Sequence, residues 1–503
     1  MRKLLSVIAA VLSTAALSVG PAGADPQFVV IHTFSNGSPD GWLPSGALAM
    51  GESGEIYGTT QRGGTICPTT EYSCGGTVYR LARPAAGKNV WQYKLLASFG
   101  TDGASPVSGL TLQKANGIFY GSTEYGGDTG CSFEPHHWGC GTVFELKPPS
   151  ASHPKWQKVI LHRFSGDTDG RLPTSAPILV GPAAISGTTA QGGKFGGGMA
   201  YRVTFTSAAT GTAAGPPAKG WRYNENEEQW YPVTTTGDLP EDLLDCGANS
   251  HPEGEGGECI CDDGSDPDDQ PLEGCGPTDN ETLALGSHHA LPLILMSPGS
   301  LFGVTREGGD DACVGSSNLG CGVVFQMKPA REGKYTYHVL YSFLGDSDGY
   351  EPIGTLTKTP EGVLYGTTLW GGTSCPVKAD KGCGTVFRLT PPKRRGDAWQ
   401  ETILHRFAGG SDGAIPAGGV MLGAGGALYG ATSYGGGCTS DTRGCGTIFK
   451  LSRPAHPNGL WRETILHSFE NGADGKNPDG ALIRDSAGHV YGTALNVLFQ
   501  IIP

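Results

Sequence analysis

The chain has 503 residues, of which 82 are glycine and 17% are charged, and its formal net charge is -13. Eighteen Asp and Glu residues and no Lys or Arg fall between 223 and 305, so the rest of the chain is slightly basic. This distribution gives no basis for binding nucleic acid or an anionic membrane surface. The high glycine content and the lack of long amphipathic patterns exclude a mainly helical protein and favour short strands joined by turns.

Residues 1–24 have the order of a secretory signal peptide. Arg2 and Lys3 precede an apolar stretch that ends in Ala22-Gly23-Ala24. That stretch is short, and no later segment holds 18 consecutive apolar residues, so we expect no membrane insertion after the signal is removed. We therefore predict a mature chain, residues 25–503, that is secreted to the periplasm or the medium.

One motif recurs seven times along the mature chain. Each copy holds W-x-E-T-I-L-H-R-F, D-G-x-x-P, L-Y-G-T-T-x-x-G-G and C-G-T-V-F-x-L elements in this order, with some degenerate copies. Neighbouring markers lie 62–66 residues apart except for one interval of 116, which indicates an insertion at 224–284. The markers are Tyr57-Gly58, Tyr120-Gly121, Ser186-Gly187, Phe302-Gly303, Tyr365-Gly366, Tyr429-Gly430 and Tyr491-Gly492.

Each copy offers four short β segments, which in the best-preserved copy are 417–422, 427–432, 446–451 and 461–469. Four strands repeated seven times predict an all-β fold, a seven-bladed β-propeller of four-stranded antiparallel blades. The chain starts in an outer-strand pattern, 28–34, and ends after the inner strands of the last copy, 481–502. We therefore expect the N-terminal strand to complete the last blade and close the ring. In the third copy, 221–223 is the expected fourth strand, and 291–295 the first strand of the fourth copy.

The L-Y-G-T-T-x-x-G-G and G-C-G-T-V-F-x-L elements resemble the GloVer tandem repeat of bacterial secreted proteins, over nearly all of the mature chain. The resemblance implies export and repetition and carries no activity. The pattern is also similar, by looser analogy, to kelch repeats.

Ten of the fourteen cysteines form five closely spaced pairs, each without a second CxxC nearby, so we expect disulfides rather than zinc sites. The insertion holds Cys246, Cys259, Cys261 and Cys275, whose connectivity stays open among three possibilities. The five expected disulfides are Cys67–Cys74, Cys131–Cys140, Cys313–Cys321, Cys375–Cys383 and Cys438–Cys445.

Antiparallel blades place the cysteine loops and the D-G-x-x-P loops on one face of the ring, around one mouth of the channel. Aspartates recur there and are expected either to stabilise their own turns or to form a carboxylate ring that binds cations or hydroxyls. These are Asp40, Asp102, Asp169, Asp348, Asp412 and Asp474. Histidines of the outer strands, His32, His162, His405 and His467, are expected to be structural.

Aromatic residues mark the same face. The position before the Gly-Gly pair holds Tyr125, Trp370 and Tyr434, and polar residues in other copies, which indicates exposure. Trp42 and Tyr350 are expected beside them. Exposed rings suit stacking against sugars, whereas loop packing is the alternative.

The fourth copy replaces the turn motif with His288-His289 next to the acidic insertion, and His136-His137 lie in a cysteine loop of the second copy. If the protein is an enzyme, these histidines and Arg306 are its candidate base and charge neutraliser. Accommodation of the insertion is the simpler explanation.

Within the insertion, four aspartates suggest Ca²⁺ without the EF-hand spacing, and a solvated acidic lobe is the alternative. They are Asp262, Asp263, Asp266 and Asp268.

These observations favour a binding protein for an extracellular glycan or another surface ligand. A secreted polysaccharide lyase or glycoside hydrolase and an inert envelope scaffold are the alternatives. The sequence leaves the ligand and the oligomeric state open.

Overall fold

The computed structural model describes residues 26–205 and 292–503 apart from short gaps, and, between 206 and 291, only the backbone of five short strands. The gaps are 36–38, 67–74, 86–87, 89, 128–130, 132–138, 167–168, 194–196, 297–298, 310–312, 314–319, 331–334, 373, 378–380, 395, 439–440 and 457–458.

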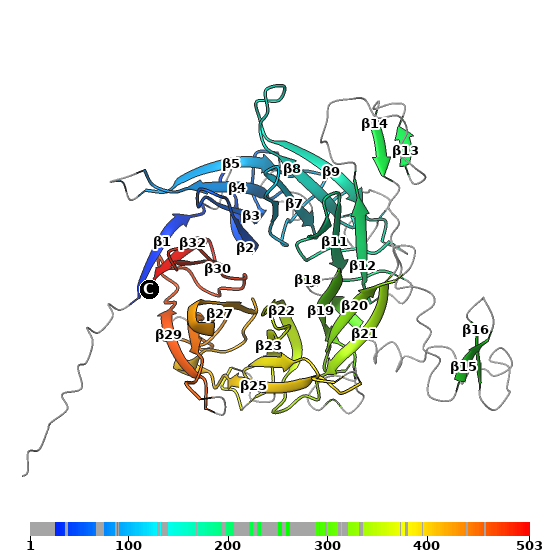
Figure 1. Cartoon of the computed structure of the whole chain (residues 1–503). Helices are drawn as coiled ribbons and strands as arrows, with labels where there is room; N and C mark the ends of the chain where they lie inside the picture. Colours follow the sequence, from blue (N-terminus) through cyan, green and yellow to red (C-terminus); the bar gives the residue numbers. More distant parts are fainter. Residues whose placement is uncertain are drawn as a thin grey trace, which may run out of the picture.

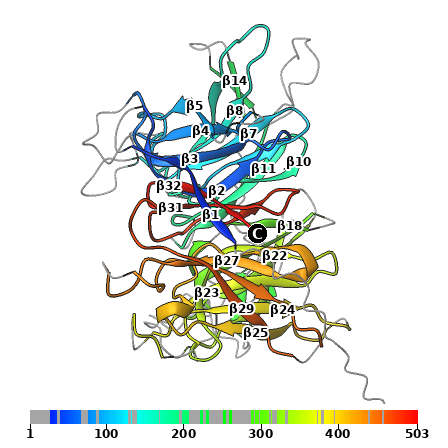
Figure 2. The same ribbon diagram turned by 90° about the vertical axis from the view of Figure 1, so that its left-hand side faces the viewer.

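Seven antiparallel sheets follow one another around a common axis and form a seven-bladed β-propeller (Figure 1). The view turned by 90° shows the blades stacked side by side, with the two ends of the chain meeting in one blade (Figure 2). Blades 1 to 6 run from an inner strand to an outer strand in chain order, and blade 7 takes its outer strand from the start of the chain. Two single-turn 3₁₀ helices, Gly410–Asp412 and Ala424–Gly426, are the helical elements among the described residues.

The strands of the first three blades are as follows. Blade 1 contains β2 (Trp42–Met50), β3 (Ile56–Arg62), β4 (Thr77–Ala82) and β5 (Gln92–Ser98). Blade 2 contains β6 (Thr111–Gln113), β7 (Ile118–Thr123), β8 (Thr142–Lys147) and β9 (Gln157–Arg163). Blade 3 contains β10 (Ile178–Gly181), β11 (Ala184–Thr189) and β12 (Met199–Thr204).

The strands of the last four blades follow the same order. Blade 4 contains β18 (Ile294–Met296), β19 (Ser300–Glu307), β20 (Val323–Pro329) and β21 (Tyr335–Ser342), with β17 (Ser287–Ala290) also paired to β19. Blade 5 contains β22 (Tyr350–Lys358), β23 (Leu364–Trp370), β24 (Thr385–Thr390) and β25 (Gln400–Arg406). Blade 6 contains β26 (Val420–Leu422), β27 (Leu428–Thr432), β28 (Thr447–Ser452) and β29 (Arg462–Ser468). Blade 7 contains β30 (Ile483–Arg484), β31 (Val490–Ala494), β32 (Val497–Ile502) and β1 (Gln27–Thr33).

The N-terminal strand closes the ring as predicted. β1 pairs antiparallel with β32, in a register that matches Gln27 with Ile502 and Thr33 with Val497. The two ends of the chain therefore share one blade, and closure leaves neither terminal blade without its neighbour.

The insertion departs from the prediction at both of its ends. The strand expected to complete blade 3 is β13 (Trp221–Asn224), which pairs with β14 (Gln229–Pro232) instead of β12. The stretch that follows Tyr223 is polar, so it lacks the Thr-Ile-Leu face that buries an outer strand. A second hairpin joins β15 (Ser250–Glu253) and β16 (Glu258–Cys261), and the first strand of blade 4 is 294–296 rather than 291–295.

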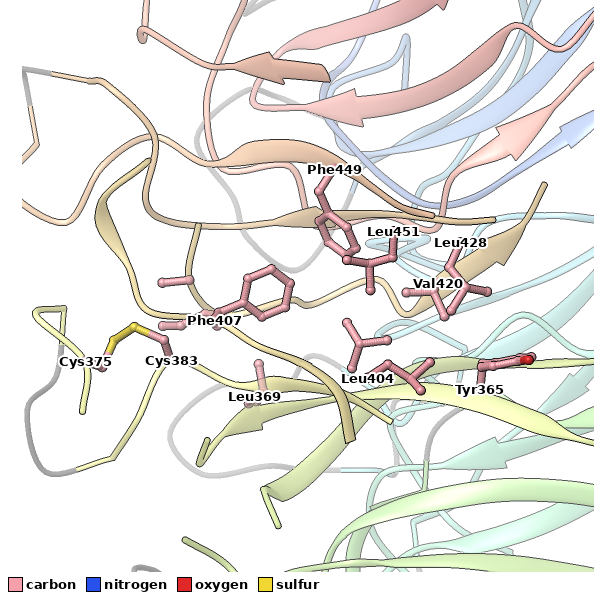
Figure 3. Packing of buried hydrophobic residues seen from close by; sticks show 13 residues of the cluster. Tyr365, Leu369, Cys375, Cys383, Leu404, Phe407, Val420, Leu428, Phe449 and Leu451 are labelled. Atoms are coloured by element: carbon pink, nitrogen blue, oxygen red, sulfur yellow. A yellow bond between two sulfur atoms is a disulfide. The ribbon is translucent and has the colours of Figure 1, made fainter. Parts of the chain in front are cut away.

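The aromatic-Gly marker is explained by close packing inside each blade. A Cβ atom on Gly430 would lie 2.4 Å from the ring of Phe449 in the next strand, and Gly366 meets Phe387 in the same way. Only glycine admits these rings, which are fully buried. Figure 3 shows Phe449 and Phe407 packed with Leu428 and Val420 in the core between blades 5 and 6.

Four of the five expected disulfides lie within the described residues and are formed: Cys131–Cys140, Cys313–Cys321, Cys375–Cys383 and Cys438–Cys445. Cys67 and Cys74 fall outside the described residues, as do Cys246 and Cys275 and the side chains of Cys259 and Cys261. Among the described residues, no helix has the length and apolar character needed to cross a membrane.

Candidate functional site

The cysteine loops and the D-G-x-x-P loops lie on the same face of the ring, as predicted; we call this the cysteine-loop face. The second cysteine of one blade accepts a hydrogen bond from the residue before the proline of the next loop. These bonds are Leu172 N to Cys140 O (2.9 Å), Glu351 N to Cys321 O (2.9 Å), Ile415 N to Cys383 O (2.8 Å) and Asn477 N to Cys445 O (2.7 Å). Each disulfide therefore holds a loop that contacts the next blade.

The residue before that proline has a left-handed backbone conformation in six copies. Its φ angle lies between 49° and 60° at Leu43, Ser105, Leu172, Glu351, Ile415 and Asn477. Side chains rarely tolerate this region, and such strain persists where the surrounding contacts impose it. The conformation recurs at equivalent places on the cysteine-loop face, where Ile415 is buried and Glu351 forms an ion pair with Arg306.

In blades 1, 2, 5 and 6 a buried threonine pair positions the residue before the Gly-Gly. In blade 5, the hydroxyls of Thr368 and Thr385 lie 2.9 Å apart, and the Thr368 hydroxyl donates to the Trp370 carbonyl. Blade 6 repeats this arrangement with Thr432 and Thr447, and Thr432 donates to the Tyr434 carbonyl. The network explains why the motif requires threonine, because both hydroxyls are fully buried and each needs a partner.

Three of the predicted aromatic residues lie under cationic groups. The Arg62 guanidinium is 5.0 Å from the Trp42 ring, the Lys381 amine is 5.4 Å from the Trp370 ring, and the Arg443 guanidinium is 4.6 Å from the Tyr434 ring. We call these the three cation–aromatic pairs. All three rings are half-buried, as is Tyr125.

Sequence reasoning missed the cations of two of these pairs. Lys381 and Arg443 each stand just before the Gly-Cys that closes a cysteine loop. Their carbonyls accept hydrogen bonds from Gly371 and Gly435, which directly follow the two aromatic residues. A basic residue at this position could have been matched to the ring, because the loop must return beside the Gly-Gly pair.

Tyr350 is not an exposed ring, which corrects the prediction. Its side chain is 1% exposed and packs in the core between blades 4 and 5. Its backbone pairs with Trp370, so the position on the face was right, but the ring points into the core.

The aspartates that recur in the D-G-x-x-P loops stabilise their turns and face the outer strands rather than the channel mouth. In five copies a turn N–H donates to the carboxylate, from Ser35, Ser165, Leu344, Ala408 and Glu470. A side chain of the preceding outer strand contacts the same carboxylate: His32 to Asp40, His162 to Asp169, Tyr341 to Asp348, His405 to Asp412 and His467 to Asp474. Asp102 instead binds Lys158.

Among the described residues, the outer strand of the next blade covers five of these six aspartate sites, all but that of Asp169. Phe28 stacks on His467 with ring centroids 3.6 Å apart, and Tyr93 stacks on His32 at 4.7 Å. Lys158, Glu401 and Glu463 occupy the equivalent position, two residues after the outer-strand tryptophan, in blades 2, 5 and 6. We call this position the covering residue.

The two glutamates at the covering position have raised pKa values. Burial, and then the neighbouring Asp412 carboxylate, raises the pKa of Glu463 to about 9. Burial opposes ionisation of Asp412, but His405, Glu463 and the N–H of Ala408 lower its pKa to about 2. Burial and Asp348 raise the pKa of Glu401 to about 8. Burial and the neighbouring aspartate therefore favour the protonated form of each Glu.

The candidate catalytic residues are placed only in part. The backbone of β17 brings His288 and His289 beside β19, with Ser287 opposite Glu307 and Ala290 opposite Thr305. Arg306 lies between those two partners. His136 and His137 fall outside the described residues, as do the calcium candidates Asp262, Asp263, Asp266 and Asp268.

A cleft of about 550 Å³ opens between blades 4 and 5 at the opposite end of the strands. Phe302, Lys328, Glu361 and Trp399 are among the residues that line it. The edge of Trp399 packs against Phe302, with ring centroids 6.5 Å apart, as the other outer-strand tryptophans pack on the marker aromatics of the preceding blade. The cleft could not be predicted from the sequence, because its residues come from three strands of blade 4 and from separate connecting segments of blade 5.

The Gloeobacter/Verrucomicrobia repeat model matches residues 17–201 and 283–497. The chain belongs to this family. The segment left unmatched, 202–282, spans most of the acidic insertion. No curated protein sequence matches the chain.

Solved structures are similar to this chain at low identity. The structure of streptogramin B lyase is 12% identical with a TM-score of 0.44 and covers 95% of this chain and 98% of its own. The calcium structure of a Trichoderma reesei family AA12 carbohydrate-active enzyme is 12% identical with a TM-score of 0.38, covering 96% of both chains. The pyranose dehydrogenase PQQ domain from Coprinopsis cinerea is 10% identical with a TM-score of 0.36, covering 96% of both.

Proposed function

We propose that this protein is secreted and binds an anionic glycan across the cysteine-loop face. The observation that carries the proposal is the set of three cation–aromatic pairs on blades 1, 5 and 6. A cation held over a ring is already positioned, so it loses less side-chain freedom when a ligand binds. The four disulfides support a location in an oxidising compartment, where such glycans occur.

The chemistry of the pairs favours an acidic sugar over a neutral one. A uronic acid or sulfated sugar offers an anion to Arg62, Lys381 or Arg443 and an apolar face to the ring edge beside it. The pairs lie on separate blades of the ring, so one short saccharide would not reach all of them. A polymer with repeated charges fits this spacing, and simultaneous contacts raise its overall affinity.

Binding of the full chain to immobilised acidic and neutral polysaccharides tests the proposal. We expect binding to an acidic polymer that weakens with salt and is at least 10-fold weaker in a Lys381→Ala, Arg443→Ala double variant. Lys328→Ala is the matched control, because Lys328 is an exposed lysine in the opposite cleft. Binding that depends on Lys328 and not on Lys381 and Arg443, or no binding to any acidic polymer, would contradict the proposal.

Cleavage of the same polymer is the second candidate function. It is favoured by the position of Arg306, which is held by Glu351 next to the strand that contains His288 and His289. In a lyase reaction, an arginine neutralises the uronate carboxylate while a histidine removes the adjacent proton. Release of unsaturated oligosaccharides by the wild-type chain, abolished in His289→Ala, would support this function; intact polymer after prolonged incubation would exclude it for the polymers tested.

A further inference from the structure

The junction between blades 5 and 6 gathers three metal-ligating side chains of three kinds. His405 comes from β25, Asp412 from the turn that follows, and Glu463 from the neighbouring β29. Their ligand atoms all lie within 4.8 Å of one another. In the part of the chain that the structure describes, no other set of three His, Cys, Asp or Glu side chains meets this condition.

The separations match those of a metal coordination sphere. His405 Nε2 lies 3.2 Å from Asp412 Oδ1 and 3.7 Å from Glu463 Oε1. Ligands about 2.1 Å from a tetrahedral ion lie about 3.4 Å from one another. Both separations from His405 Nε2 are within a few tenths of an ångström of this value.

Two of the three ligand atoms are buried and lack a well-aligned hydrogen bond. Glu463 Oε1 and His405 Nε2 are inaccessible to solvent and form no well-aligned hydrogen bond. The three side chains are 18%, 26% and 13% exposed for His405, Asp412 and Glu463. Buried polar atoms normally have a hydrogen-bond partner, and the 3.7 Å between His405 Nε2 and Glu463 Oε1 is too long for one, so a shared ligand between these two atoms would satisfy both.

An equivalent junction shows which kind of group belongs there. Between blades 1 and 2 the covering residue is Lys158, whose amine lies 2.8 Å from the Asp102 carboxylate and 3.0 Å from the Ser98 carbonyl. A protein cation thus occupies the space beside the turn aspartate. Between blades 5 and 6 the covering residue is a carboxylate, so the protein supplies ligands and lacks the cation.

We propose that His405, Asp412 and Glu463 bind one divalent transition-metal ion, with Zn²⁺ as the matching probe, at the junction of blades 5 and 6. One imidazole and two carboxylates suit Zn²⁺ and its neighbours in the first transition series. Three protein ligands leave a position for water on the partly exposed side. The ion connects the outer strands of two blades, and it therefore stabilises the folded ring in proportion to its occupancy.

Titration of the chelator-treated full chain with ZnCl₂, followed by calorimetry, tests this site. We expect Glu463→Gln to lose one equivalent of bound Zn²⁺, or to bind it at least 100-fold more weakly. Co²⁺ gives a second readout, since its visible absorption bands report coordination by these ligands and should disappear in the same variant. The acidic insertion is unchanged in the variant, so the difference from wild type isolates the junction.

Glu401→Gln is the matched control. Glu401 is the covering residue of the preceding junction, but Tyr341 stands there in place of a histidine, so wild-type zinc binding should be retained. If Glu463→Gln fails to fold, Glu463→Phe replaces it, because Phe28 shows that phenylalanine fits the covering position over a His–Asp pair. Unchanged zinc stoichiometry and affinity in the Glu463 variant, or an equal loss in Glu401→Gln, would overturn the proposal.

Discussion

Two junctions of the ring each contain a histidine and a turn aspartate at equivalent positions, but they differ in the residue that covers this pair. Between blades 6 and 7, Phe28 stacks on His467, and His467 reaches Asp474 at 3.2 Å. Between blades 5 and 6, Glu463 takes the place of Phe28 and faces His405 and Asp412. The repeat thus supplies the same supporting pair at these two junctions, while one variable residue decides whether the site is an apolar contact or a ligand set.

Exchange of the covering residue should transfer the property between the two junctions. Phe28→Glu places a carboxylate over His467 and Asp474, which recreates the three-ligand set in a second junction. We expect a loss of about 2 kcal/mol of stability without metal, because the stacked ring is removed. Saturating Zn²⁺ should recover a similar amount and add one bound equivalent. Denaturant unfolding with and without zinc measures both effects.

Phe28→Gln separates the two contributions to that result. It loses the same ring contact and offers no carboxylate, so zinc should not restore its stability. If zinc changes the stability of the two variants equally, the His–Asp pair and a carboxylate at the covering position do not suffice to make a zinc site.

The junction between blades 4 and 5 provides the pH comparison. The pKa of Glu401 is raised to about 8 by burial and by Asp348, against the opposing influence of Arg406 and Arg388, and Tyr341 shares the Asp348 carboxylate. At pH values between the ordinary pKa of glutamate and about 8, the folded state therefore holds a proton that the unfolded state has already released. Stability contributed by this group is present at low pH and is lost as pH rises towards 8.

Glu401→Gln should remove this dependence. The free energy of unfolding of the variant, measured relative to wild type, should be about 1 kcal/mol higher at pH 9 than at pH 5. This value is already reduced for solvent screening at a half-buried site. Unfolding midpoints at the two pH values provide the measurement. A wild-type pH profile in the variant would show that Glu401 ionises normally.

The smallest effect is expected between blades 1 and 2. Asp102 is 43% exposed, so its ion pair with Lys158 is partly screened by water. Lys158→Met should cost less than about 1 kcal/mol, and high salt should reduce the difference from wild type. A larger loss that does not depend on salt would mean that the lysine acts through its packing over Phe99.

The recurrence of short β patterns was enough to predict the seven blades and the closing N-terminal strand, since each copy repeats the same apolar segments and turns. Residues 221–223 form a strand as expected, but it pairs with β14 rather than completing blade 3, and the residues after it are polar. The prediction that the Tyr350 ring is exposed was wrong because the repeat pattern placed the residue along the strand but did not decide whether its side chain points to solvent or into the core.

The junctions could not be predicted because their members come from different copies. His405 and Asp412 are seven residues apart, but Glu463 lies in the next repeat and meets them only because adjacent outer strands pack together. The histidines were therefore considered structural, and the aspartates were placed at the channel mouth. Aligning the copies by their covering residue would have revealed the substitution of Phe by Glu, although not the distances.

Anomalous X-ray diffraction at the zinc edge, from crystals of the chelator-treated chain soaked in ZnCl₂, tests the central claim most directly. The account predicts an anomalous peak within bonding distance of His405 Nε2, Asp412 and Glu463, and none beside His467 and Asp474, where Phe28 covers the pair. Peaks at both junctions, or no peak at the junction of blades 5 and 6, would contradict it.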